Sequence, residues 1–251
     1  MKMPACIGNG IRAALCVAAP LDCVACGAPA EAAQPWPLCA ACSESLLAQL
    51  RDAPDPEGRN SARCTVCGKP IISERCVCTR CRGTEFGFDS AYPLFRYAGD
   101  IRDILLAYKA GNRRSLAGFL ATGIAETLRA RYPGRAVVPV PPRPAKLRRK
   151  GWDQVEAIAR VLERRYGVTV CRILTRADGQ EQKALDLEGR SANLSGKIGL
   201  VRGVPRRTIR VPVDPVLLDD VLTTGATLSA CASVLKAAGA VRVDAVAIAA
   251  D

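Results

Sequence analysis

Eight cysteines in four Cys-x-x-Cys pairs are the residues of this chain best suited to bind a metal ion. The pairs are Cys23/Cys26, Cys39/Cys42, Cys64/Cys67 and Cys78/Cys81. A spacing of two residues lets one tight turn point both sulfurs at a single ion, and two such pairs complete a tetrahedral shell of four thiolates. Gly27 and Gly68 directly follow the second cysteine of a pair, where such a turn often needs a permissive backbone. The sequence therefore predicts structural Zn²⁺.

The spacing leaves open how many ions are bound and which pairs join. Consecutive pairs, which we favour, would form two four-thiolate sites, whereas interleaved pairs are the alternative. Cys76 is close enough in sequence to Cys81 to replace Cys78 as a ligand. Disulfides and a redox-active Cys-x-x-Cys motif are the competing interpretations. A reducing cytosol disfavours disulfides, and four pairs are more than a thioredoxin-like motif uses.

A second segment with chemical potential, VLLDDVLTTGAT, occupies residues 216–227. Its apolar start predicts a buried strand that ends at Asp219 and Asp220, and the Thr-Thr-Gly-Ala-Thr loop then opens a helix. Backbone N–H groups at a helix N-terminus and threonine hydroxyls can hold a phosphate, and Gly225 permits close approach of the backbone. The two carboxylates suit the neighbouring hydroxyls of a ribose, or a bound cation. The segment therefore fits a sugar phosphate.

The surrounding sequence predicts the elements that position this segment. Apolar residues recur at helical spacing after Asp100 and Ser115, which are both placed to cap a helix, and Asp153 with Glu156 forms a capping-box pattern. The predicted helices cover residues 101–110, 116–128, 154–165 and 226–238, and the predicted strands cover 136–140, 168–174, 216–218 and 241–249. Strands that alternate with helices predict an α/β fold with a parallel sheet, and its sites lie beyond the carboxyl ends of the strands.

Composition excludes several classes of function. The 251 residues include no histidine, so a Ser-His-Asp triad, a Cys-His dyad and a zinc site with an imidazole ligand are impossible. No apolar run reaches the roughly 20 residues needed to span a bilayer. We interpret the mildly apolar stretch 11–21 as a short helix or an irregular arm rather than a signal peptide. We therefore expect a cytoplasmic protein without membrane insertion.

The formal net charge of +12 favours anionic partners, either nucleic acid or a phosphorylated small molecule. Five cations fall within eight residues: Arg143, Lys146, Arg148, Arg149 and Lys150. This segment can hold a diphosphate, bind single-stranded DNA or be a solvated run of charge, and the sequence leaves these three roles open. Trp152 beside it can stack on a base or anchor the chain in the core.

Taken in order, these motifs resemble the ComF family of zinc-finger-bearing, phosphoribosyltransferase-like proteins, which are associated with natural competence and DNA uptake. VLLDDVLTTGAT is similar to the phosphoribosyl pyrophosphate (PRPP) signature of type I phosphoribosyltransferases. The resemblance extends from about residue 20 to the end of the chain. Its further motifs are Phe88-Asp89, Tyr97 to Gly99, Tyr108-Lys109, Val138 to Pro141, KGWDQ at 150–154, and the spacing of Gln182, Leu185, Arg190 and Asn193.

The resemblance implies a Cys-rich zinc-binding module over residues 1–85 and a type I phosphoribosyltransferase-like domain over residues 86–251. It also implies binding of PRPP together with Mg²⁺, with Asp219 and Asp220 as the catalytic acidic pair. The implied PRPP-binding residues are Asp219, Asp220, Val221, Leu222, Thr223, Thr224, Gly225, Ala226 and Thr227. The implied pyrophosphate loop, at 138–143, includes Pro141, Pro142 and Arg143, and a mobile loop from Arg176 to Asn193 includes Gln182 and Arg190.

Three functions follow from these observations as hypotheses. The first is a phosphoribosyltransferase that acts on an acceptor which the sequence does not name. The second is a non-catalytic PRPP-sensing competence factor that binds single-stranded DNA or a protein of the competence machinery. The third is a scaffold that binds neither ligand, and the intact Thr-Thr-Gly-Ala-Thr loop argues against it. The sequence leaves the oligomeric state open.

Overall fold

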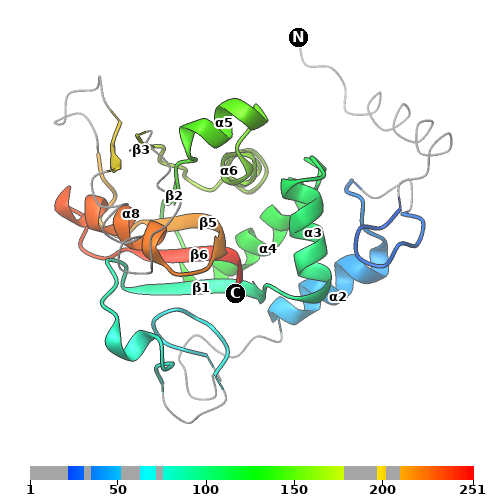
Figure 1. The fold of residues 1–251 in the computed structure, drawn as a ribbon, viewed down its shortest axis with the longest axis horizontal. Helices are drawn as coiled ribbons and strands as arrows, with labels where there is room; N and C mark the ends of the chain where they lie inside the picture. Colours follow the sequence, from blue (N-terminus) through cyan, green and yellow to red (C-terminus); the bar gives the residue numbers. More distant parts are fainter. Residues whose placement is uncertain (1–21, 31–34, 52–62, 72–75, 178–196, 202–209) are drawn as a thin grey trace.

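A parallel four-stranded sheet forms the centre of the computed structural model, which describes residues 22–30, 35–51, 63–71, 76–177, 197–201 and 210–251 (Figure 1). The strand order is β1-β6-β5-β2, and each neighbouring pair is parallel. The strands are β1 (Ser90–Arg96), β2 (Val137–Pro139), β5 (Val216–Leu222) and β6 (Asp244–Ala250). The predicted α/β fold, a parallel sheet flanked by helices, is confirmed.

Helices cover both faces of this sheet. The helices are α2 (Ala40–Arg51), α3 (Gly99–Lys109), α4 (Leu116–Arg131), α5 (Pro144–Lys150), α6 (Gln154–Tyr166) and α8 (Ala226–Ala237). Successive strand residues point to opposite faces, so Val216 and Leu218 pack with the core of α2, α3, α4 and α6, whereas Leu217 packs with α8. Burial of both faces explains why the strands have continuous apolar sequences rather than alternating ones.

The helix starts agree in part with the predicted caps. Asp153 caps α6 as predicted, because its carboxylate accepts hydrogen bonds from the N–H groups of Val155 and Glu156. Asp100 does not cap α3, since the helix begins at Gly99 and places Asp100 in its first turn. Ser115 precedes α4, but its backbone is already helical and its hydroxyl makes no capping bond. Both predictions of a side-chain cap were therefore wrong.

The predicted strand 168–174 is largely absent from the main sheet. Val170 makes one isolated parallel bridge to Val137, and the chain then leaves the sheet. A separate two-stranded antiparallel sheet follows, formed by β3 (Leu174–Arg176) and β4 (Ile198–Leu200). These two strands flank residues 178–196, so Gln182 and Arg190 lie outside the described residues, as does the stretch 11–21.

Strand β1 and helix α2 are among the elements that were not predicted. Strand β1 contains Pro93, which lacks the N–H group that a central strand would donate, and β1 lies at the edge of the sheet, where proline is tolerated. Helix α2 begins directly after Cys39 and contains Cys42, the other member of the second cysteine pair, and it docks through Leu46, which is buried in the core. Within the described residues, no helix combines the length and the apolar character needed to cross a membrane.

Candidate functional site

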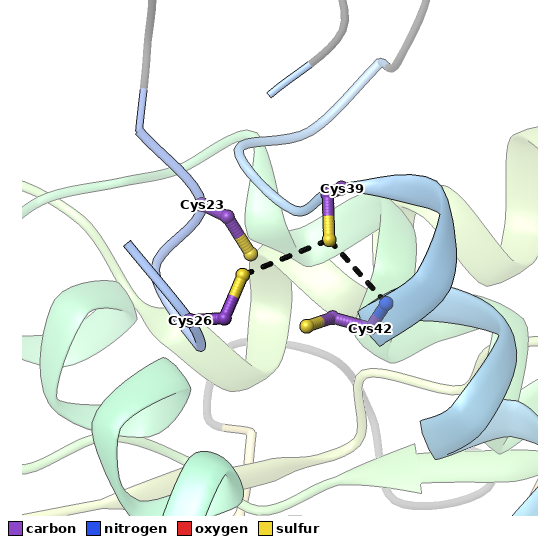
Figure 2. Close-up of side chains that lie close together, drawn as sticks. All are labelled: Cys23, Cys26, Cys39 and Cys42. Atoms are coloured by element: carbon purple, nitrogen blue, oxygen red, sulfur yellow. Dashed lines mark hydrogen bonds between the residues drawn. The ribbon is translucent and has the colours of Figure 1, made fainter. Parts of the chain in front are cut away.

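The four Cys-x-x-Cys pairs form two separate clusters. Cys23, Cys26, Cys39 and Cys42 form the Cys23 cluster (Figure 2), and Cys64, Cys67, Cys78 and Cys81 form the Cys64 cluster. Within each cluster, the sulfur atoms all lie within 4.8 Å of one another. Consecutive pairing is therefore confirmed. Cys76 is exposed and stands outside both clusters, so Cys78 is the residue that completes the second set.

The geometry of both clusters fits Zn²⁺. Cys26 Sγ lies 3.8 Å from Cys39 Sγ, and Cys67 Sγ lies 3.8 Å from Cys78 Sγ. Tetrahedral Zn–S bonds of about 2.3 Å place neighbouring sulfurs about 3.8 Å apart, whereas a disulfide brings them to about 2.05 Å. All eight cysteines have free thiols. The donor set and its spacing suggest zinc binding at both clusters.

Burial and hydrogen bonds act in opposite directions on the thiols of the Cys64 cluster. Burial opposes ionisation of Cys64, but backbone N–H groups, including that of Cys78 at 3.4 Å, lower its pKa to about 7. Burial and the neighbouring sulfurs raise the pKa of Cys81. One sulfur therefore ionises readily, while accumulation of further thiolates is opposed. A divalent cation would relieve this opposition.

The two clusters pack against different cores. Cys23 is buried with Leu38 and Leu46 in the core that includes α4 and α6. Cys64 and Cys81 are buried in the core that includes α8. In Figure 1 the segment 22–30 lies beside α2, whereas the segment 63–71 lies beyond β1, on another side of the molecule.

The acidic pair lies inside strand β5 rather than at its end. The predicted boundary at Leu218 was too early, because β5 pairs with β6 as far as Leu222, which is in register with Ala250. Asp220 Oδ2 forms an ion pair with Lys109 Nζ at 2.9 Å, and Asp219 Oδ1 accepts a hydrogen bond from the N–H of Asp220 at 2.8 Å. The Asp220 carboxylate therefore points toward the end of α3.

The environment of Asp219 favours its protonated form. Burial and the neighbouring carboxylate of Asp220 raise the pKa of Asp219 well above its ordinary value, and the Lys109 ammonium only partly opposes this. A cation or a hydroxyl donor at this position would stabilise the ionised form. The pair is thus suited to a ligand that presents hydroxyl groups or a metal ion.

The loop after β5 leads into the N-terminus of α8, where the first backbone N–H groups have no acceptor within the helix. Gly225 adopts a left-handed conformation with φ 79°, and α8 begins at the next residue. Thr224 Oγ1 accepts a hydrogen bond from the N–H of Ala226 at 3.3 Å. The N–H groups of Thr227 and Leu228 fall in the first helical turn, where an α-helix offers no internal acceptor. Val221 and Leu222 are strand residues, and they pack on opposite faces of the sheet.

Two motifs distant in sequence lie next to the acidic pair. Tyr108, beside Lys109, is fully buried, and its hydroxyl donates to the carbonyl of Gln154 at 2.7 Å. Its ring meets Trp152 edge-on at 5.2 Å. Arg114 and Lys150 lie over the Trp152 ring, and these contacts support the anchoring role of Trp152 rather than stacking on a base.

The segment implied as the pyrophosphate loop follows β2, which is the neighbour of β5. The N–H of Val140 donates to the carbonyl of Leu218 at 2.9 Å, so this segment starts beside the acidic pair. Pro141 is buried, Pro142 is half-buried and Arg143 is exposed. Arg176 lies on β3, and the sequence analysis named it only as the first residue of the implied mobile loop. Burial and the nearby Arg143 lower its pKa, while Asp219 acts in the opposite direction.

Comparison with known proteins supports the resemblance inferred from the motifs. No family model matches the chain. The chain is 25% identical over 177 residues to the competence protein ComFC of Streptococcus pneumoniae (strain ATCC BAA-255 / R6). This match covers 70% of the chain and 76% of the relative. The predicted resemblance to the ComF family is confirmed by this distant relative together with the two four-cysteine clusters.

Proposed function

We propose that this protein binds PRPP with Mg²⁺ and transfers its phosphoribosyl group to an acceptor, in a role linked to DNA uptake or nucleotide metabolism. The observation that carries this proposal is that the acidic pair and the threonine-rich loop occupy one turn from β5 into α8. Asp219 and Asp220 on β5 lie a few residues before a loop that leads into the N-terminus of α8. Similarity to a competence protein supports the link to DNA uptake.

The proposed ligand matches this turn group by group. The 5-phosphate would bind the N–H groups and hydroxyls of residues 223–227, and the ribose hydroxyls would bind Asp219 and Asp220. Lys109, 2.9 Å from Asp220, would hold that carboxylate in place. Arg143 and Arg176 would provide positive charge for the diphosphate. Mg²⁺ would neutralise charge on the leaving diphosphate, and both four-cysteine clusters would hold structural zinc.

The proposed reaction is a substitution at the anomeric carbon of PRPP. A nucleophile of the acceptor, in our proposal a nitrogen, forms a bond to this carbon as the bond to pyrophosphate breaks. Pyrophosphate departs with the bonding electron pair, through an oxocarbenium-like transition state. The carboxylates of Asp219 and Asp220 would stabilise the positive charge that develops on the ribose. Exclusion of water from the site would prevent hydrolysis.

Replacing both carboxylates should weaken PRPP binding at least tenfold. Each charge-assisted hydrogen bond contributes about 1.5–3 kcal/mol, and about 1.4 kcal/mol corresponds to a factor of ten. We expect Asp219→Asn with Asp220→Asn to lose PRPP affinity but to bind inorganic phosphate like the wild type, since phosphate needs only the loop. Isothermal titration of both ligands against both proteins measures this difference. Asp214→Asn, an exposed carboxylate before β5, is the control.

Two outcomes would contradict the assignment of this site. The first is a wild-type protein that does not bind PRPP in the presence of Mg²⁺. The second is a double variant that binds it as tightly as the wild type. A wild type that binds PRPP but releases no pyrophosphate with any nucleobase would favour a sensor over a transferase.

The second candidate function is a non-catalytic, PRPP-sensing competence factor that binds single-stranded DNA. Helix α5 favours it, because the helix buries none of its residues and exposes the side chains of Arg148 and Arg149. Such a factor could also bind a protein of the competence machinery. In this proposal the protein works in the cytoplasm, where single-stranded DNA and PRPP are both accessible.

If α5 binds DNA, affinity for single strands should fall steeply with salt, with a slope of about −0.7 for each phosphate contact. Replacing Arg148, Arg149 and Lys150 by alanine should flatten that slope by about 2. Fluorescence anisotropy with a labelled oligonucleotide at several salt concentrations measures it. Removing Arg160, Arg164 and Arg165 from the exposed face of α6 is the control with the same change in charge. Equal slopes for the two triple variants would exclude α5 as the DNA site.

A further inference from the structure

The Cys64 cluster contacts the loop that we propose to bind phosphate. Arg80, between the ligands Cys78 and Cys81, donates a hydrogen bond from Nη1 to the carbonyl of Thr223 at 2.8 Å. The two residues are 143 positions apart in the sequence. Because Arg80 lies within the Cys-x-x-Cys turn, its backbone position depends on the same turn that brings the sulfurs of Cys78 and Cys81 into the cluster.

The segment that follows the Cys64 cluster packs against the loop at residues 223–227 and against α8. The rings of Phe86 and Phe88 stack at 4.8 Å between centroids. Phe86 packs so closely on Gly225 that a Cβ there would lie 2.9 Å from a ring carbon. The N–H of Gly87 donates to Ser229 Oγ in the first turns of α8 at 2.6 Å. Residues 80–88, here the connecting segment, therefore contact the loop, its glycine and the helix that follows.

The other side of the Cys64 cluster is fixed to the sheet. The N–H of Ala91 in β1 donates to the carbonyl of Val66 at 2.7 Å. Arg63 Nη1 donates to the carbonyls of Gly68 and Pro93, both at 3.0 Å. Strand β1 is paired with β6, so these contacts fix the Cys64 cluster to the sheet. Gain or loss of a metal ion would therefore change the position of the connecting segment rather than move the cluster as a whole.

The contact with Thr223 sets the direction of a phosphate donor. In a trans peptide the carbonyl and the following N–H point to opposite sides, and none of the described peptide bonds is cis. Arg80 holds the Thr223 carbonyl toward the Cys64 cluster, so the N–H of Thr224 points away from the cluster. Loss of this bond would let the peptide rotate and would remove that N–H from the set of loop donors.

We propose that Arg80 is a positioning residue for the anion site at residues 223–227, and that it couples metal occupancy of the Cys64 cluster to anion binding. This inference rests on the proposed function, since it takes the loop as the phosphate site. Coupling between two sites is reciprocal. A phosphate ester on the loop should therefore retain the metal in the Cys64 cluster, and an intact cluster should tighten binding of the ester. The Cys23 cluster packs in a different core and should not respond.

Thiol alkylation of the full-length zinc-loaded protein tests the coupling, with ribose 5-phosphate as the probe. A chelator is added with iodoacetamide, and mass spectrometry follows modification of each cysteine. Saturating ribose 5-phosphate should slow alkylation of Cys64, Cys67, Cys78 and Cys81 about fivefold or more. Alkylation of the Cys23 cluster should proceed at an unchanged rate, which makes it an internal control.

Variants at Arg80 test the route of the coupling. Arg80→Ala should abolish the protection and weaken ribose 5-phosphate binding about fivefold, and Arg80→Lys, which keeps one donor, should restore part of both. Arg82→Ala is the matched control, because Arg82 donates to Val77 within the same module. Zinc content should stay unchanged in all three.

The possible outcomes separate this inference from the proposed function. If wild-type protein binds neither PRPP nor ribose 5-phosphate, the proposed function fails first. If it binds both but ribose 5-phosphate protects neither cluster, or protects both equally, the coupling is wrong while the proposed function stands. Equal affinity and protection in Arg80→Ala and wild type would also overturn it. The wild-type pattern alone decides the coupling if Arg80→Ala does not fold.

Discussion

Cys78→Ser is expected to reduce the zinc content from two ions per chain to one and to destabilise the protein severely. Metal binding contributes roughly 10–16 kcal/mol to the folding of zinc-finger peptides, which is comparable to the whole stability of about 5–15 kcal/mol of a typical domain. Inductively coupled plasma mass spectrometry measures the zinc, and thermal unfolding measures the stability. Cys23→Ser should also remove one ion, and it should loosen α2, since Cys23 and Leu46 share a core.

Cys76→Ser is the matched control for this prediction. Cys76 is two residues from Cys78 but is exposed and lies outside both clusters. Its variant should keep two zinc ions and unfold at the wild-type temperature. Wild-type protein without zinc, or with its cysteines paired as disulfides, would contradict the zinc assignment. Loss of zinc from Cys76→Ser with retention in Cys78→Ser would contradict the ligand set.

Local spacing was enough to predict the four Cys-x-x-Cys pairs as metal-binding residues, because such a turn needs no information from the rest of the fold. It favoured consecutive pairing, but the structure was needed to exclude interleaved pairing and the use of Cys76. It could not predict where the clusters pack. Cys23 and Cys64 join different cores, and that choice depends on contacts with α2, β1 and α8. The bond between Arg80 and Thr223 was equally inaccessible, since nothing in either segment identifies a partner 143 residues away.

The end of strand β5, at the acidic pair, also could not be predicted from the local sequence. Apolar residues predicted the strand only as far as Leu218, because two carboxylates normally end a buried strand. Strand β5 continues through Asp219 and Asp220 because pairing with β6 supplies its backbone hydrogen bonds as far as Leu222. The Lys109 ammonium then offsets one of the charges. Tertiary pairing thus outweighs the local pattern at the residues where we place the ligand.

A second group of short hydrogen bonds and ion pairs lies at the opposite end of the sheet from the acidic pair. Asp244, at the start of β6, is fully buried and accepts hydrogen bonds from Ser90, Arg135 and Arg242 at 2.6 to 3.2 Å. Burial alone would raise its pKa, but the donors, above all Arg242, lower the pKa of Asp244 below its ordinary value. Sites of parallel α/β sheets lie at the carboxyl ends of the strands, so these contacts, at the amino ends, serve stability.

Asp244→Ala should therefore destabilise the protein by about 3–5 kcal/mol without changing the ligand site, because it leaves the largely buried Arg135 charge without its closest partner. Asp214→Ala is the matched control. Asp214 also pairs with Arg135, at 3.5 Å, but its side chain is 55% exposed, so the cost should stay below about 1 kcal/mol. Urea unfolding of the zinc-loaded proteins at pH 7 measures both effects. Equal stability of the two variants would show that the buried contacts contribute little.

The pH dependence of Asp244→Asn gives a second test of the same contacts. A carboxylate with a lowered pKa contributes stability that is present above its unfolded-state pKa and is lost as pH falls through the folded-state value. Both values lie at or below the ordinary carboxyl range, so the stability difference between wild type and Asp244→Asn should stay constant from pH 7.5 to about 5.5. A difference that shrinks within this window would mean that Asp244 takes up a proton there, and its ion pairs would then be weaker than the geometry indicates.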